Sequence, residues 1–126
     1  MKCSTICLAL FFSVLCQAKT FESFSLPVYN KNSETFNYPK DAKGKYVVIN
    51  FWAQWCTSCI QELPELENLK KKNPEVVFLG VNAGDSVNKI KKFQQKYSFS
   101  YVILQDENRV FSKSRKIGFC SNTVAS

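Results

Sequence analysis

The segment Trp55-Cys56-Thr57-Ser58-Cys59 constrains this chain more than any other, because it lies where one periodicity gives way to another. Residues 46–53 before it are nearly all apolar and strand-forming, whereas residues 60–72 carry apolar side chains at helical spacing. Two intervening residues in the first turn of a helix bring the sulfurs of Cys56 and Cys59 within bonding reach. The sequence therefore predicts a dithiol at a helix start.

The position of Cys56 predicts its chemistry. Backbone N–H groups in the first turn of a helix have no partners within the helix, and the helix dipole places positive charge there. Both effects stabilise a thiolate, so cysteine pKa values at such sites fall to roughly 3.5–7.5 from about 8.5. We therefore predict that Cys56 attacks a substrate disulfide and that Cys59, deeper in the first turn, resolves the mixed disulfide.

The composition limits the other chemistries that are open to the chain. Its 126 residues are 45% hydrophobic, as in a single globular domain, and they include no histidine. Cys–His nucleophile pairs and histidine metal ligands are therefore excluded. A structural disulfide or half of a zinc site is the alternative for Cys56 and Cys59, but zinc needs more ligands than Cys120 adds. We predict no metal and no cofactor, and we interpret Cys120 as an incidental free thiol.

Lysines carry most of the net charge of +7. We interpret those in residues 60–72 and 87–97 as the solvent-facing sides of two helices; they are Lys70, Lys71, Lys72, Lys89, Lys91, Lys92 and Lys96. Because base recognition needs more than charge, we predict no nucleic-acid partner.

The N-terminus has the pattern of a secretory signal peptide. Lys2 precedes an apolar stretch over residues 6–16, and Cys16-Gln17-Ala18 fits a cleavage site. We expect residues 1–18 to be removed and residues 19–126 to form one domain outside the cytoplasm, secreted or periplasmic. The alternative is an uncleaved membrane anchor, although the stretch is shorter than the about 20 apolar residues that a span needs.

Periodicity predicts the remaining elements. Strands are expected at 21–26, 34–38, 46–53, 76–82 and 101–104, and helices at 60–72, 87–97 and 110–117. The first two strands are expected to form a hairpin. An apolar stripe is expected along the first helix at Ile60, Leu63, Leu66 and Leu69, and Asp85 or Ser86 is expected to cap the second. Apolar strands that alternate with helices predict an α/β fold around a parallel sheet.

These residues resemble the thioredoxin-like superfamily, and within it the extracytoplasmic TlpA/ResA type of thiol–disulfide oxidoreductase. The resemblance rests on residues 48–59, on Glu62 and Pro64 after them, on Val81-Asn82, and on residues 101–106. A Cys-x-x-Cys pair in this strand–helix context is far more specific than an isolated pair. The resemblance implies a thioredoxin-like fold with an N-terminal β-hairpin.

The resemblance also implies a redox-active disulfide between Cys56 and Cys59, with Cys56 as the exposed nucleophile. It implies that Glu62 lies near the cysteines and modulates their ionisation, and that Trp55 flanks the site. Members of the family reduce disulfides in secreted proteins or in apocytochromes c, with electrons from a membrane partner. We therefore expect a protein disulfide reductase, with disulfide-containing protein substrates and a membrane-bound electron donor as its partners.

The C-terminal residues depart from the family pattern. Relatives carry a cis-proline there, but residues 118–124 contain no proline, and the chain then stops at Ser126. We therefore expect a truncated fold that lacks the final β-hairpin and the C-terminal helix. One face of the sheet would lose its covering helix. The strand at 46–53 would become an open edge, through which chains associate with one another.

Two other functions compete with the reductase. The chain is alternatively an inactive truncated fragment that binds other chains through its exposed strand. A peroxidase of the peroxiredoxin type shares the fold, but those enzymes resemble Pro-x-x-x-Thr-x-x-Cys at the nucleophile. Residues 48–55 contain neither proline nor threonine, so we favour this function less. The direction of electron flow depends on the partners' potentials, and Thr57-Ser58 indicates neither extreme.

Overall fold

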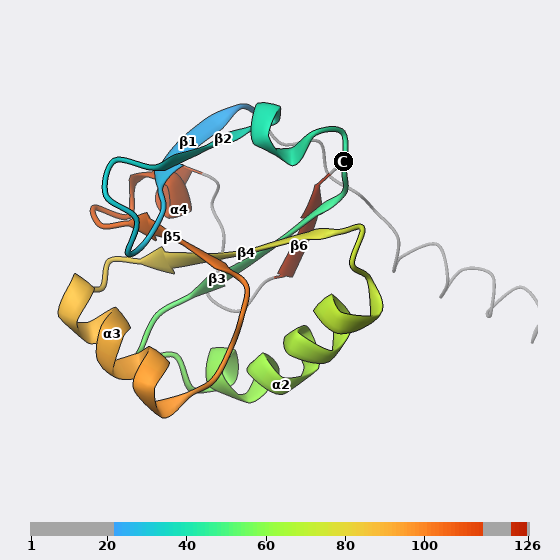
Figure 1. Cartoon of the computed structure of the whole chain (residues 1–126). Helices are drawn as coiled ribbons and strands as arrows, with labels where there is room; N and C mark the ends of the chain where they lie inside the picture. Colours follow the sequence, from blue (N-terminus) through green and yellow to red (C-terminus); the bar gives the residue numbers. More distant parts are fainter. Residues whose placement is uncertain (1–21, 115–121, 126) are drawn as a thin grey trace, which may run out of the picture.

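The computed structural model describes residues 22–114 and 122–125 of the chain (Figure 1). Its elements, in chain order, are β1 Phe24–Pro27, β2 Thr35–Tyr38, the 3-10 helix η1 Lys40–Ala42, β3 Val47–Trp52, α2 Thr57–Lys72, β4 Val77–Ala83, α3 Val87–Lys96, β5 Val102–Asp106, α4 Val110–Ser114 and β6 Asn122–Ala125. The predicted signal peptide, residues 1–18, and Cys120 lie outside the described residues. Within these residues, no helix combines the length and the apolar character that crossing a bilayer requires.

Four strands form the central sheet, in the order β5-β4-β3-β6. β3 pairs with β4 and β4 pairs with β5 in parallel, so that Trp52 lies opposite Asn82 and Asn82 opposite Gln105. The carboxyl ends of parallel strands meet at one edge of a sheet, and the loops after β3 and β4 therefore lie together (Figure 1). This confirms the predicted α/β fold and brings the cysteine motif beside the turn that precedes α3.

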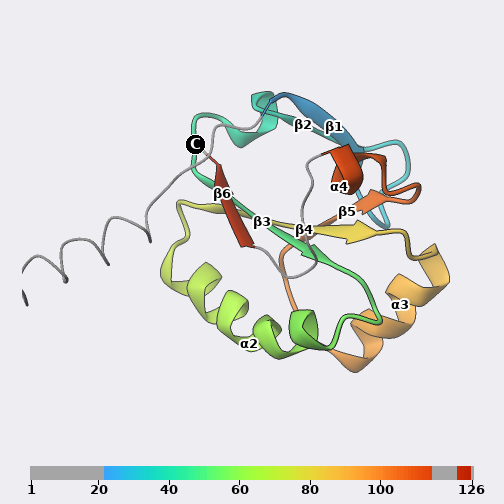
Figure 2. The same cartoon turned by 180° about the vertical axis from the view of Figure 1, so that it is seen from behind.

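Opposite faces of the sheet are covered by different elements. α2 and α3 lie on one face, and β1, β2 and α4 lie on the other (Figure 1, Figure 2). Each face has its own buried core, and the core under the helices consists of Trp52, Cys56, Cys59, Leu63, Leu66, Phe78, Ile90, Phe93, Tyr101 and Ile103. The cysteine pair is thus part of the packed interior between α2 and the sheet.

The predicted N-terminal hairpin is confirmed, and it is attached to the sheet. β1 and β2 pair antiparallel, with Phe24 opposite Tyr38. The backbone N–H of Tyr29 donates to the carbonyl of Ile103 at 2.9 Å, which holds the hairpin beside β5. The ring of Phe24 lies 4.6 Å from the ring of Phe111 in α4. The hairpin and α4 therefore cover this face of the sheet, and the expected loss of a covering C-terminal helix stays a prediction.

The expected open edge at β3 is wrong over most of the strand. β6 pairs antiparallel with β3, from Val47 opposite Ala125 to Asn50 opposite Asn122. The unpaired N–H and C=O groups of an edge strand bind an extended segment through the backbone alone. Residues 122–125 provide such a segment, although no family motif is recognisable there. The open edge from which self-association was predicted is therefore occupied by β6 over these four residues.

The first long helix begins three residues before its predicted start and ends at its predicted end, and its buried face differs in part from the prediction. α2 continues through Pro64 and ends at the cap residue Asn73. Leu63 and Leu66 are buried, but Leu69 is 43% exposed, which corrects the predicted stripe. Three residues turn a helix by about 300°, so side chains spaced by three drift by about 60° at each step. By Leu69, this drift has turned the side chain away from the sheet.

Candidate active site

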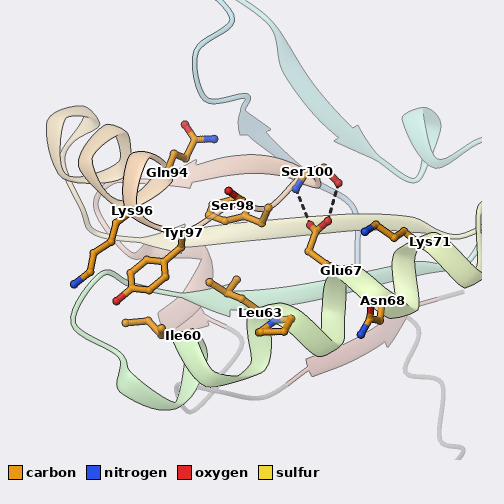
Figure 3. A pocket seen from close by; sticks show the side chains of 12 residues that line it. Ile60, Leu63, Glu67, Asn68, Lys71, Gln94, Lys96, Tyr97, Ser98 and Ser100 are labelled. Carbon is orange, nitrogen blue, oxygen red and sulfur yellow. Dashed lines mark hydrogen bonds between the residues drawn. The ribbon is translucent and has the colours of Figure 1, made fainter.

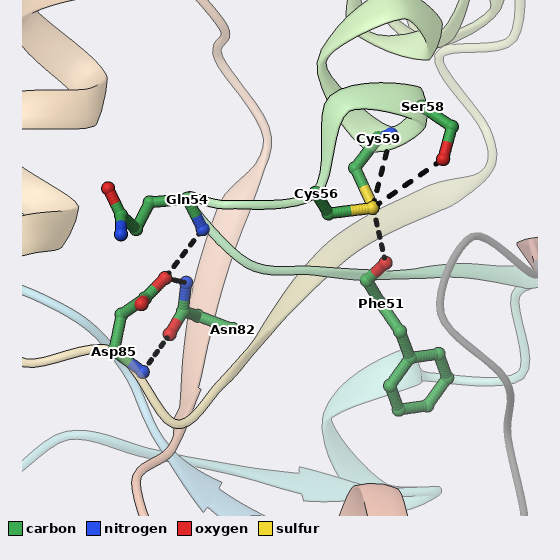
Figure 4. The surroundings of a disulfide bond; sticks show 7 residues. All are labelled: Phe51, Gln54, Cys56, Ser58, Cys59, Asn82 and Asp85. Carbon is green, nitrogen blue, oxygen red and sulfur yellow. Dashed lines mark hydrogen bonds between the residues drawn. A yellow bond between two sulfur atoms is a disulfide. The ribbon is translucent and has the colours of Figure 1, made fainter.

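The cysteine motif forms the turn between β3 and α2 (Figure 4). Cys56 is the N-cap residue of α2, with an extended backbone at φ −85° and ψ 97°. Its Sγ accepts a hydrogen bond from the Cys59 N–H at 3.4 Å. The Cα atoms of the two cysteines are 5.3 Å apart, and their sulfurs are joined in a disulfide. The Cys56 sulfur therefore occupies the position where the first N–H groups of the helix point.

The surroundings of this sulfur favour negative charge. The first turn of α2 carries no acidic side chain, and its last turn is basic. The hydroxyl oxygen of Ser58 lies 3.7 Å from Cys56 Sγ. After reduction of the disulfide, a Cys56 thiolate has the Cys59 N–H and the Ser58 hydroxyl as donors, and it faces the positive end of the helix dipole.

The two cysteines differ in exposure, but by less than predicted. Cys56 is 5% exposed and Cys59 is 1% exposed. The expected exposed nucleophile is therefore largely covered, because the N-cap residue packs into the core between α2 and the sheet. Cys59 Sγ lies 3.6 Å from the carbonyl oxygen of Phe51, to which its thiol can donate after reduction. Cys56 is still the more exposed residue of the pair.

Trp55 and Glu62 stand on either side of the cysteine pair in the chain. Trp55 directly precedes the motif and is 55% exposed. Its indole therefore offers an exposed apolar surface one residue before Cys56. Glu62 lies on α2, three residues after Cys59, and is half-buried. The roles predicted for Trp55 and Glu62 stay predictions.

A buried carboxylate that the sequence analysis missed holds the motif in place. Asp85 is 4% exposed, and its Oδ2 accepts hydrogen bonds from the Gln54 N–H at 2.7 Å and from Asn82 Nδ2 at 2.9 Å (Figure 4). Asn82 Oδ1 in turn accepts from the Asp85 N–H at 3.0 Å. Sequence reasoning treats Asp85 as a possible helix cap, but Ser86 caps α3. The signal that points to Asp85 is its position after a buried strand, at the same sheet edge as the motif.

An aromatic cluster supports the motif from the sheet side. The ring of Trp52 lies 4.6 Å from that of Phe93 and 5.8 Å from that of Phe99, which stacks on Tyr101 at 4.9 Å. Burial raises the pKa of Tyr101 above its ordinary value, and the negative charge of Glu67 raises it further. Among the described residues, neither the Tyr101 hydroxyl nor Trp52 Nε1 has a hydrogen-bond partner. The base of the site is therefore apolar and closely packed.

Metal ligation finds no support in the described ranges, 22–114 and 122–125, where no three acidic, cysteine or histidine side chains are grouped to hold an ion. A disulfide that caps a helix directly after a parallel strand is the arrangement of thioredoxin-like proteins, and this chain has their fold. The chain belongs to the AhpC/TSA family, whose model matches residues 17–124.

Individual relatives cover part of the chain. It is similar to the thioredoxin-like protein YneN of Bacillus subtilis, with 37% identity over 75 residues that cover 56% of this chain and 44% of YneN. It is similar to the thiol-disulfide oxidoreductase ResA of the same organism, with 35% identity over 71 residues that cover 55% of this chain and 40% of ResA. The matched part is thus less than half of either relative.

A solved structure extends the likeness of the fold. The thioredoxin domain of a thiol-disulfide oxidoreductase from Bacteroides vulgatus superposes with a TM-score of 0.71. The match covers 86% of this chain and 80% of that one, at 20% sequence identity. At this identity the likeness establishes the fold alone.

Proposed function

We propose that this chain is a thiol–disulfide oxidoreductase that reduces protein disulfides. The observation that carries the proposal is the Cys56–Cys59 disulfide at the start of α2, with the Cys59 N–H bonded to Cys56 Sγ at 3.4 Å. A sulfur at such a position is stabilised as the thiolate, which is the reactive form in disulfide exchange. The name of the relative ResA, a thiol-disulfide oxidoreductase, supports the same chemistry.

The reaction begins with the reduced dithiol. The Cys56 thiolate attacks one sulfur of a substrate disulfide, and the second substrate sulfur leaves as a thiolate that takes a proton from water. The Cys59 thiol then loses its proton to solvent and attacks Cys56 Sγ in the mixed disulfide. The remaining substrate sulfur leaves as a thiolate. The substrate gains two electrons, and Cys56 and Cys59 lose two as they form their disulfide.

Two neighbours of the cysteines have proposed roles in these steps. Glu62 is half-buried and three residues after Cys59, and its charge tunes the loss of the Cys59 proton. Trp55 contacts the polypeptide that carries the substrate disulfide, since its indole is exposed directly before Cys56. Another cycle requires a dithiol donor, which we propose to be membrane-bound. The signal-peptide pattern of residues 1–18 supports a site of action outside the cytoplasm, with residues 19–126 as the working domain.

Turnover of insulin disulfides in the presence of dithiothreitol tests the proposal. Wild-type protein is expected to accelerate insulin reduction, and Cys56→Ser is expected to abolish the acceleration. Cys59→Ser keeps the nucleophile but cannot resolve the intermediate, so it is expected to accumulate a mixed disulfide that mass spectrometry detects. Turnover that persists in Cys56→Ser would reject Cys56 as the nucleophile.

The AhpC/TSA match makes a peroxidase the second candidate to test. The residues before Cys56 lack the proline and threonine that mark a peroxidatic cysteine, so we expect no consumption of hydrogen peroxide above the rate with dithiothreitol alone. Rapid, Cys56-dependent consumption of hydrogen peroxide without any reduction of insulin would reject the reductase function in favour of the peroxidase.

A further inference from the structure

A trough runs along α2 on the side that faces the end of α3 and residues 97–100 (Figure 3). Its volume is about 960 Å³. Apolar side chains from both walls line it, namely Ile60, Leu63, Pro64, Tyr97 and Phe99. Of these, Leu63 is buried and Ile60, Tyr97 and Phe99 are half-buried. The trough therefore offers apolar surface that is still accessible from solvent.

The trough extends toward the cysteine pair. A second hollow of about 270 Å³ shares Ile60, Lys96 and Tyr97 with the first, so the two adjoin. The second hollow is also lined by Gln54, which is two residues before Cys56. A chain that lies in the trough can thus continue from α2 to the loop that carries the disulfide.

The dimensions suit a short extended peptide. Along α2 the lining runs from Ile60 to Lys71, a rise of about 17 Å at 1.5 Å per residue. An extended polypeptide advances about 3.3 Å per residue, so about five residues span this part of the trough.

The charge along this trough is positive. Lys71 lines the first hollow, Lys89 and Lys92 line the second, and Lys96 lines both. None of these four lysines forms an ion pair with a residue that the structure describes. The acidic side chain in the lining is Glu67, whose carboxylate already accepts from the Ser100 N–H at 2.6 Å and from the Ser100 hydroxyl at 2.9 Å (Figure 3).

Glu67 also connects the two walls of the trough. Its two hydrogen bonds to Ser100 connect α2 to the opposite wall. Lys70 reinforces the same connection by donating to the Ser100 carbonyl and hydroxyl oxygens, both at 2.9 Å. The walls are therefore joined at one point. Outside this cluster, the four lysines have no carboxylate partner among the described residues, and Lys96 Nζ lies 5.2 Å from the centre of the Tyr97 ring, so their positive charge is open to an acidic partner.

We propose that this trough binds an acidic polypeptide segment next to the disulfide of the substrate. The inference rests on the proposed reductase function and specifies its substrate class. Acidic side chains of the segment pair with Lys89, Lys92 and Lys96, and its apolar side chains contact Ile60 and Tyr97. Binding there places the neighbouring substrate cystine at Cys56, and the surface discriminates against basic substrates by charge repulsion.

Binding of a labelled peptide without cysteine tests the inference independently of redox chemistry. The probe is a short peptide of alternating acidic and apolar residues, and its binding to the oxidised full chain is followed by fluorescence anisotropy. The test variant is Lys89→Glu/Lys92→Glu/Lys96→Glu. The control, Lys40→Glu/Lys45→Glu/Lys113→Glu, changes the net charge equally at lysines outside the trough.

We expect the test variant to bind the acidic peptide at least roughly tenfold more weakly and the control variant to stay within about twofold of wild type. Raising NaCl from about 50 mM to about 500 mM should weaken wild-type binding, because exposed charges are screened. Retained folding of each variant is checked by circular dichroism, and Lys89→Gln/Lys92→Gln/Lys96→Gln replaces a test variant that does not fold.

Equal losses in the test and control variants would overturn the inference, because net charge alone would then explain binding. Equal binding of a lysine-rich peptide, or tighter binding of a single-stranded oligonucleotide of the same charge, would overturn it as well. Reduction of an acidic-flanked disulfide peptide should fall in the test variant, while reduction of the small neutral compound 2-hydroxyethyl disulfide should not change. Absence of turnover on every disulfide would reject the reductase function and leave the peptide-binding result to be judged separately.

Discussion

The hydrogen bonds to Asp85 predict how strongly the cysteine motif depends on a residue outside it. In Asp85→Ala, the Gln54 N–H and Asn82 Nδ2 lose an acceptor that lies at 2.7 and 2.9 Å. A buried donor left without its acceptor costs about 1–3 kcal/mol. The Gln54 N–H is partly buried, so water compensates for some of its loss. We therefore expect a decrease of about 2–4 kcal/mol in the free energy of unfolding.

Urea denaturation of the oxidised protein, followed by the fluorescence of the buried Trp52, measures this change at constant m value. Asp85→Asn keeps the shape and one acceptor oxygen, so its expected loss is smaller, about 1–2 kcal/mol. Glu75→Ala is the matched control, because it removes an exposed acidic side chain and should change stability by less than about 0.5 kcal/mol.

The same variants test the positioning of the motif. Because the Asp85 carboxylate fixes the backbone two residues before Cys56, the kcat/KM of Asp85→Ala for insulin should fall under conditions where the protein is still folded. Rescue by Asp85→Asn toward the wild-type rate would show that the acceptor geometry matters more than the charge. An Asp85→Ala protein as stable and as active as the Glu75→Ala control would refute this reasoning.

Three further predictions follow from the core and from the helix start. In the reduced protein, alkylation of Cys56 by iodoacetamide, followed by peptide mapping, should be half-maximal below the pH of about 8.5 that is typical of a free thiol; a midpoint at or above that pH would remove the basis of the redox proposal. Burial and the charge of Glu67 raise the pKa of Tyr101, so the folded state keeps a proton that the unfolded state releases near the ordinary pKa of 10.0. The free energy of unfolding should therefore decrease as the pH rises from 10.0 toward the pKa of the folded state. Tyr101→Phe should remove this loss and should stabilise the protein by about 1 kcal/mol at neutral pH, since its hydroxyl has no partner among the described residues; a destabilised variant would contradict the assignment. Gly80→Ala places a Cβ 2.5 Å from the Tyr101 ring, so it should destabilise the protein by about 1–3 kcal/mol in thermal or urea unfolding, and an unchanged midpoint would show that the ring moves freely.

Local pattern was sufficient for the parts of this protein that depend on near neighbours in the chain. The strand before Cys56 and the helix that contains Cys59 are visible as a change of period. The strand lies within one residue of its predicted bounds, whereas the helix begins three residues before its predicted start and ends at its predicted end. The hairpin and the alternation of strands and helices were predictable for the same reason. The position of Cys56 at the start of a helix also follows from adjacent residues, since a cap needs no distant partner.

Contacts between distant residues were decided by the tertiary structure. Asp85 binds the backbone of Gln54 across 31 positions of sequence, and no local pattern distinguishes this role from that of an ordinary helix cap. The burial of Cys56 depends on how α2 packs on the sheet, which a motif does not contain. β6 pairs with β3 through backbone groups, which residues of many types can supply. Comparison of residues 118–124 with the family motif therefore did not predict this strand.

The sequence by itself thus determined the dithiol, the order of the elements and the class of fold, because these depend on periodicity and on residue type. Only the tertiary structure brought together the basic trough, whose lysines and apolar side chains come from α2, α3 and residues 97–100. Those segments are neighbours only after β3, β4 and β5 have aligned in register. That alignment determines which side chains of α2 and α3 face one another. The spacing of side chains along a single helix does not contain this information.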